Sequence, residues 1–273
     1  MDFPIRRVGE KNMHYFESDE DSSIQLVFLP SGFNPELWKH QLRYFSRSFK
    51  TIAFQPTTSE RDRKGEIECL KEILDKDSVN NAVIISHHLG NSIAQEIEYN
   101  ENVVGLVTTG SRDRFTKKPP RMVYGMMKKL ACGEPKLVKK LLFSEYAKYE
   151  TVKGFVEDIE IPEYDTFKEY LQGYSIEKPV KHSMVIHARN DRFSDLDFIR
   201  SMKPGPQISI IQEAGSFSFY ERPGDYNKAL NDFLLRLEDF VEEQELAEAK
   251  SRNRSLKDFD RSKGLKKKVK VKK

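Results

Sequence analysis

Short apolar runs recur along the first part of the chain, and segments with helical spacing separate them. Four of these runs have the length and the β-branched content of buried strands: residues 24–29, 50–54, 81–86 and 103–109. The segments between them place their apolar residues on one helical face: residues 38–45, 65–74 and 91–99. Because strands buried on both faces read as continuous apolar runs, the pattern predicts an α/β fold with a mostly parallel, doubly wound sheet.

The pattern changes after residue 110. Helical spacing then dominates, and strand-like runs resume only at residues 183–187 and 207–211. A long amphipathic helix is expected at residues 225–250. A length of 273 residues fits one large domain with an insertion. The sequence therefore predicts an α/β core in two pieces, residues 1–110 and 181–260. The helical cap lies between them, at residues 111–180.

Four segments at the ends of the predicted strands carry sequence motifs. In chain order they are residues 29–38 (LPSGFNPELW), 84–91 (IISHHLGN), 185–193 (VIHARNDRF) and 213–223 (EAGSFSFYERP). In the same order they resemble the oxyanion loop, the nucleophile elbow G-H-S-x-G-G, the turn that presents the triad acid and the histidine segment G-H-x-x-x-x-E-x-P of the α/β-hydrolase superfamily. The resemblance covers about residues 20–240 and implies that superfamily's fold, with a helical cap.

The residues that carry chemistry in this superfamily are altered here. The turn from strand to helix at the elbow is strained, so small residues must flank its centre, and Ser86 and Gly90 meet that requirement around His88. His88 therefore stands where the resemblance implies the nucleophilic serine. Ser216 stands where it implies the catalytic histidine, and Asp191 matches the acid.

The resemblance also implies an oxyanion hole and leaves one alternative for the acid. The oxyanion donors would be the backbone N–H groups of Phe33 and Leu89, in a loop that includes Gly32. Ser31 replaces the histidine that the superfamily has in this loop. Asp113, just after the fourth predicted strand, is the alternative acid.

Three functions remain open for this site. The first is a pseudo-hydrolase of esterase ancestry that binds a ligand or a partner without catalysis. The second is an esterase-like hydrolase with its parts exchanged, in which His88 accepts the proton of Ser216 and donates to Asp191. The third is a general base made of His88 and Asp191 that acts without an acyl intermediate.

The predicted cap is rich in apolar residues at helical spacing. Met122, Met126 and Met127 belong to this set, together with several leucines. Such residues form either an adaptable lid over a small apolar ligand or the packing of the cap against itself. The sequence alone leaves both interpretations open.

Positive charge is concentrated at the carboxyl end of the chain. Residues 261–273 (RSKGLKKKVKVKK) carry eight Lys or Arg and no acid, so the rest of the chain has a net charge of −5 within a total of +3. Disorder is expected here, because the charges repel and little apolar surface can be buried. The tail is interpreted either as a solubilising segment or as a weak binder of nucleic acid or another polyanion.

Cysteine usage and hydropathy indicate a cytoplasmic protein. Cys69 and Cys132 are far apart, which argues against a disulfide framework and a zinc site and fits a reducing compartment. The N-terminal residues contain no apolar run, and no stretch approaches the roughly 18 apolar residues of a membrane span. We assign no cofactor and no metal.

Overall fold

A computed structural model describes most of the chain. The described residues are 5–7, 13–18, 20, 22–29, 33–56, 62–75, 79–97, 100–111, 120–131, 135–172 and 182–269. The chain divides into two units, residues 1–233 and 234–273, which are described separately.

A single eight-stranded sheet organises the first unit, in the order β1-β2-β4-β3-β5-β6-β7-β8. Six neighbouring strands are parallel: β4 (Lys50–Pro56), β3 (Gln25–Phe28), β5 (Ala82–His87), β6 (Val103–Thr109), β7 (His182–Ala188) and β8 (Gln207–Ile211). The predicted α/β fold class is confirmed. The antiparallel strands β1 (Ile5–Arg7) and β2 (Met13–Glu17) extend one edge and were not expected, because these residues form no apolar run.

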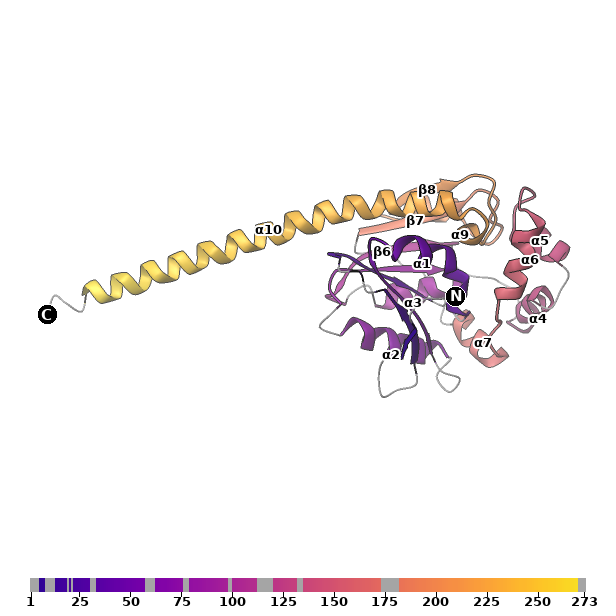
Figure 1. The fold of residues 1–273 in the computed structure, drawn as a ribbon, viewed down its shortest axis with the longest axis horizontal. Helices are drawn as coiled ribbons and strands as arrows, with labels where there is room; N and C mark the ends of the chain where they lie inside the picture. The colour runs from indigo at the N-terminus through magenta and orange to yellow at the C-terminus, as the bar shows by residue number, and fades with distance from the viewer. Residues whose placement is uncertain are drawn as a thin grey trace. The chain divides into compact units, whose positions relative to one another are not determined.

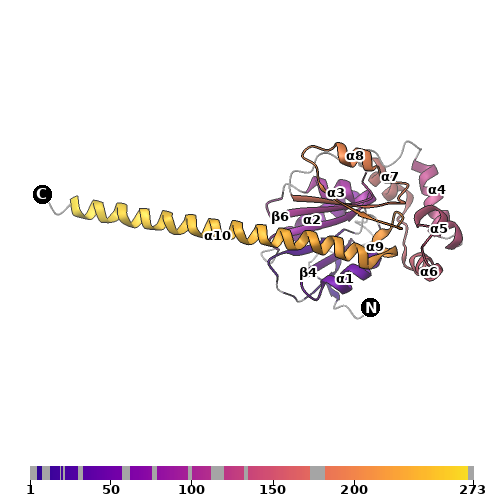
Figure 2. The same cartoon turned by 90° about the horizontal axis from the view of Figure 1, so that it is seen from above.

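Helices cover both faces of this sheet (Figures 1 and 2). On one face, α1 (Lys39–Phe45) meets the first turns of α10 (Pro223–Val269), and Gln41 donates to Asn227 at 3.0 Å. On the other face, α2 (Arg63–Leu74) and α3 (Asn91–Glu96) are joined by an ion pair of 2.6 Å between Arg63 and Glu96. All side chains of β3 and β5 are accordingly buried, as their continuous apolar runs require.

The residues that the structure describes between β6 and β7 form four helices, which we call the cap. They are α4 (Pro120–Ala131), α5 (Pro135–Leu142), α6 (Tyr149–Asp158) and α7 (Tyr164–Gln172). Two hydrogen bonds, one buried and one partly buried, tie the cap to the core. The hydroxyl of Tyr170 donates to the carboxylate of Glu66, and Tyr220 donates to Asp158 at 2.5 Å. The cap is thus held on two sides rather than hinged on one.

The second unit continues α10 as far as Val269, and residues 270–273 lie outside the described residues. Helix at residues 261–269 differs from the disorder expected from their charge. Two effects oppose that charge repulsion. Lysine and leucine have high helix propensity, and cations near the carboxyl end of a helix interact favourably with its dipole.

Candidate functional site

His88 lies directly after β5, at the first residue of the short 3-10 helix η2 (His88–Gly90) that leads into α3. Its backbone φ of +43° is in the left-handed region, which residues other than glycine rarely adopt. Buried polar bonds brace this turn. Ser86 donates to Asn91 at 2.8 Å, and Asn91 donates to the carbonyl of Thr109 at 3.0 Å. The turn is therefore held by residues on either side of His88.

The ring of His88 fits against the backbone of Gly110, at the end of β6. A Cβ atom at position 110 would lie 2.3 Å from Cε1 of His88, so only glycine leaves room for the ring. Nδ1 of His88 is 3.0 Å from the carbonyl oxygen of Gly110. Because a carbonyl only accepts hydrogen bonds, Nδ1 carries the hydrogen of this contact.

Asp191 lies in the turn after β7, between the other two candidate residues. Its Oδ1 accepts from the hydroxyl of Ser216 at 2.6 Å and from the backbone N–H of Phe193 at 2.8 Å. Its Oδ2 lies 4.0 Å from Nε2 of His88, beyond hydrogen-bond distance. The structure thus brings His88, Asp191 and Ser216 together, with the carboxylate rather than the imidazole in the middle.

Ser216 is held in place by the cap. Its backbone N–H donates to the carbonyl of Leu142 at 2.8 Å, and its side chain is buried. A Cβ atom at the preceding Gly215 would lie 2.5 Å from that same carbonyl oxygen, so the loop and the end of α5 are in close contact. Ser216 therefore belongs to a packed joint between the core and the cap.

Glu221 completes this joint and was not singled out from the sequence. Its carboxylate accepts from the N–H of Gly215 at 2.8 Å, from the N–H of Ser144 at 3.1 Å and from the Ser144 hydroxyl. The residue corresponds to the glutamate of the histidine segment G-H-x-x-x-x-E-x-P. The motif could have identified Glu221, because it places an acid six residues after Gly215, whose N–H donates to the carboxylate.

His87 is the second residue that the sequence analysis missed. Its ring is buried 4.1 Å from that of His88, and its Nε2 lies 2.9 Å from the carbonyl oxygen of Ser216. Burial holds the pKa of His87 well below its usual value, and the neighbouring His88 lowers it further, while the contact with Ser216 opposes the shift. His87 is therefore a neutral hydrogen-bond donor that links the two loops. The paired histidines in the sequence were the signal.

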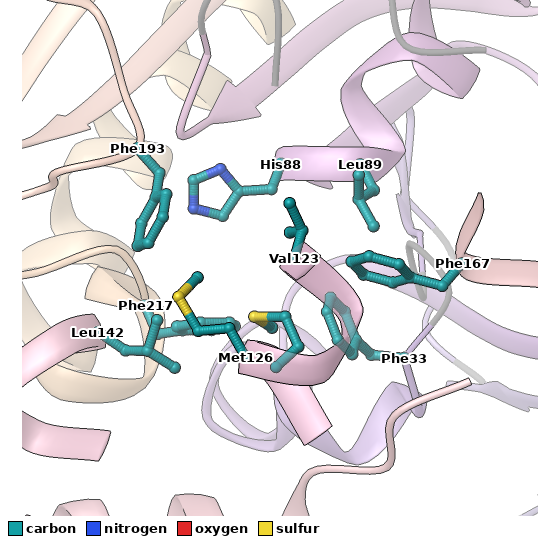
Figure 3. Close-up of a pocket in the computed structure, with 10 residues that line it drawn as sticks. Phe33, His88, Leu89, Val123, Met126, Leu142, Phe167, Phe193 and Phe217 are labelled. Carbon is teal, nitrogen blue, oxygen red and sulfur yellow. The ribbon is translucent and has the colours of Figure 1, made fainter. Parts of the chain in front are cut away.

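A small apolar pocket lies between His88 and the cap (Figure 3). Its cavity volume is about 30 Å³, which is room for no more than a few water-sized groups. The pocket is lined by Phe33, His88, Leu89, Val123, Met126, Met127, Leu142, Phe167, Phe193 and Phe217. Among these residues, His88 is the one with an ionisable side chain. Met126 and Met127 of the cap line this pocket, whereas Met122 is exposed.

The remaining candidates divide between the pocket and other places. Phe33 and Leu89, the expected oxyanion residues, both line the pocket. Gly32 and Asp113 lie outside the described residues, so those expectations stay predictions. His187 is buried beside Ser194, with Nδ1 at 3.0 Å from its hydroxyl, and it does not line the pocket.

The described part of the chain contains neither a metal-binding cluster nor a membrane-spanning helix. Within it, no group of three His, Cys, Asp or Glu side chains is placed to hold a metal ion. No helix traced there combines the length and the apolar character that crossing a membrane requires.

Comparison with known proteins defines the fold. No protein-family model matches the sequence, and no curated protein sequence matches it significantly. Solved structures do match. An esterase from Thermogutta terrifontis has a TM-score of 0.68 at 14% identity, over 83% of this chain and 94% of that one. E-2-(acetamidomethylene)succinate hydrolase has a TM-score of 0.66 at 12% identity, over 85% and 99%.

A bromoperoxidase from Bacillus anthracis is also similar, with a TM-score of 0.60 at 12% identity, over 81% of this chain and 95% of that one. These three enzymes share the α/β-hydrolase fold with each other and with this chain. The protein therefore has the α/β-hydrolase fold, as the four sequence motifs predicted.

Proposed function

We propose that this protein is a pseudo-hydrolase, which binds a small apolar ligand beneath the cap and does not transfer acyl groups. One observation carries the proposal: the hydroxyl of Ser216 donates its hydrogen to Asp191. A hydroxyl has a single proton to donate, so His88 cannot accept it in this arrangement. The solved structures with this fold that are esterases or hydrolases support a hydrolase ancestry.

Acyl transfer also needs a nucleophile that can reach the substrate. Ser216 is 2% exposed and is not among the residues that line the pocket, whereas His88 is. Moreover, the group that accepts from Ser216 is a carboxylate. A carboxylate is a much weaker base toward an alcohol than an imidazole is. The described geometry therefore supports binding rather than covalent catalysis.

The ligand class follows from the lining of the pocket. Nine of the ten lining residues are apolar, and the cap contributes Met126 and Met127, whose unbranched side chains can rotate to enlarge the space. A compact apolar molecule fits this surface better than a polar metabolite, because His88 is the one ionisable residue among those that line it.

A hydrolase with exchanged parts is the alternative, and one distance favours it. Nε2 of His88 lies 4.0 Å from Asp191, so the imidazole already occupies the region near the acid. Such an enzyme would need the Ser216 hydroxyl to turn from Asp191 toward His88. It would also need the loop to leave Leu142 so that the serine could face a substrate.

Hydrolysis of p-nitrophenyl esters distinguishes these functions. We expect no turnover by the wild type above the uncatalysed rate. The double variant His88→Ser with Ser216→His restores the usual order of side chains and is expected to gain measurable activity. Turnover by the wild type that is lost in Ser216→Ala but kept in Ser218→Ala, a buried serine two residues away, would overturn the proposal.

The basic segment at residues 261–273 supports a separate proposal, that it binds polyanions weakly. Eight cations without an aromatic residue predict binding that falls steeply with salt and has no base preference. Titration of fluorescent RNA with the full chain and with a chain lacking these residues tests it. Equal binding by both would assign the segment a solubilising role only.

A further inference from the structure

The helix α4, which borders the pocket with one side, exposes a different set of residues on the other. Val123 and Met127 are buried and face the pocket. Met122, Lys128 and Lys129 are exposed. At about 100° per residue, positions 122, 128 and 129 all lie within roughly 60° of the direction opposite to the buried Val123 and Met127, so these three residues point away from the pocket.

The helix α5 repeats this arrangement. Val138 and Leu142 are buried, whereas Lys136, Leu137 and Lys140 are exposed at the spacing of one helical face. Both views of the fold show α4 and α5 on the side of the cap that is away from the sheet (Figures 1 and 2). We call the exposed residues of these two helices the outer cap face.

The exposed side chains of the outer cap face include several lysines and no acid among the described residues of α4 and α5. Neither α4 nor α5 contains Asp or Glu, although the chain without its last thirteen residues has a net charge of −5. The four exposed lysines make no ion pair with any residue that the structure describes. Lys139 is excluded from the face, because its ammonium donates to the carbonyl of Ala147 at 2.6 Å.

Two large apolar side chains lie among these lysines. Met122 is 60% exposed and Leu137 is 44% exposed, in contrast to the buried Met127 and Leu142 of the same helices. A nucleic acid or an acidic polymer would be attracted by the lysines but would make little use of the apolar residues. A lipid surface with anionic headgroups uses both, since cations stay at the headgroups while apolar side chains enter the acyl boundary.

We infer that the outer cap face docks on the surface of an anionic phospholipid bilayer. In this arrangement the helices that roof the apolar pocket lie against the lipid, which is a natural reservoir of apolar ligands. The inference holds whether or not the pocket transfers acyl groups, so it does not depend on the function proposed above.

Vesicle co-sedimentation of the full chain tests the contribution of charge. Binding is expected with vesicles that contain phosphatidylserine and not with phosphatidylcholine alone. The variant Lys128→Glu with Lys129→Glu should lose at least about 25-fold in affinity, because each lysine near an anionic leaflet contributes roughly fivefold. The matched control reverses the exposed Lys71 and Lys228, outside the face, and should bind like the wild type.

Two further variants separate the lipid from other anionic partners. Met122→Ser with Leu137→Ser should lose at least about tenfold in vesicle binding and leave binding to heparin unchanged, because heparin offers no apolar phase. If vesicle binding is insensitive to this pair, the partner is an acidic polymer or protein and the inference is wrong.

The basic tail is the remaining competitor for anionic vesicles. A full-length variant should therefore keep most of its vesicle binding when three lysines of the tail are each changed to Gln, namely Lys266, Lys267 and Lys268. The inference is also wrong if this tail variant alone abolishes binding, or if the wild type does not bind anionic vesicles at all.

Discussion

The loop that carries His88 and the loop that carries Ser216 differ in what they face and in what holds them in place. His88 remains at a strained turn with its ring at the pocket, held against Gly110 and braced by Ser86 and Asn91. Ser216 points its hydroxyl at Asp191 and is joined through its backbone to the cap. The first loop faces the pocket, whereas the second is bonded to Asp191 and to the cap.

The difference also shows what each loop requires of its neighbours. The His88 turn is supported from within the core, by hydrogen bonds between β5, α3 and β6. The Ser216 loop is supported from the cap by the carbonyl of Leu142. Glu221 adds to this support, because its carboxylate accepts from the N–H groups of both Gly215 and Ser144. Changes at the cap should therefore disturb Ser216 more than His88.

The largest expected effect comes from Gly215→Ala. The new methyl group would meet the backbone of Leu142 and Phe143, which cannot rotate away as a side chain can. We expect a loss of about 3 kcal/mol or more in the free energy of unfolding, measured by urea denaturation. Gly224→Ala is the control, since a Cβ atom there meets nothing within 4 Å and alanine favours a helix. Equal effects at both positions would contradict the close contact.

A double-mutant cycle between Gly110 and His88 should show the next effect. Gly110→Ala alone should cost about 2–3 kcal/mol, from overpacking against the ring and from the positive φ of +70°. In the His88→Ala background only the backbone cost of about 1 kcal/mol should remain. The coupling energy from urea denaturation of the four proteins measures the contact between ring and glycine. Additive effects would show that the ring lies elsewhere.

The stability of the protein should fall as the pH is lowered, and His87 should contribute to this. Its pKa is lowered in the folded state, so below its unfolded value of about 6.5 the unfolded chain binds more protons. The free energy of unfolding should then fall by up to about 1.4 kcal/mol per pH unit for this group. Lowered pKa values of His40 and His187 act in the same direction.

The variant His87→Gln keeps a donor toward the carbonyl of Ser216 but does not titrate. Urea denaturation between pH 7.5 and pH 5.5 should therefore show a smaller loss of stability for this variant than for the wild type. A pH dependence that is the same in this variant and in the wild type would contradict a neutral, buried His87.

Much of this arrangement could be predicted from the sequence. The six parallel strands follow from apolar runs, and residues placed after parallel strands meet at the carboxyl edge of the sheet, which brings His88, Asp191 and Ser216 together. The hydrogen bonds among the three could not be predicted. They depend on the space that Gly110 leaves for a ring and on the contact between Gly215 and Leu142, residues far apart in the sequence.

Labelling with a fluorophosphonate, read by mass spectrometry of the intact protein and its peptides, tests most directly whether the site has lost its nucleophile. These probes react with a serine that an adjacent base activates. Because the Ser216 hydroxyl is buried and bonded to Asp191, we predict no adduct on Ser216. A stoichiometric adduct on Ser216 that disappears in His88→Ala would contradict the account and establish a working hydrolase with exchanged parts.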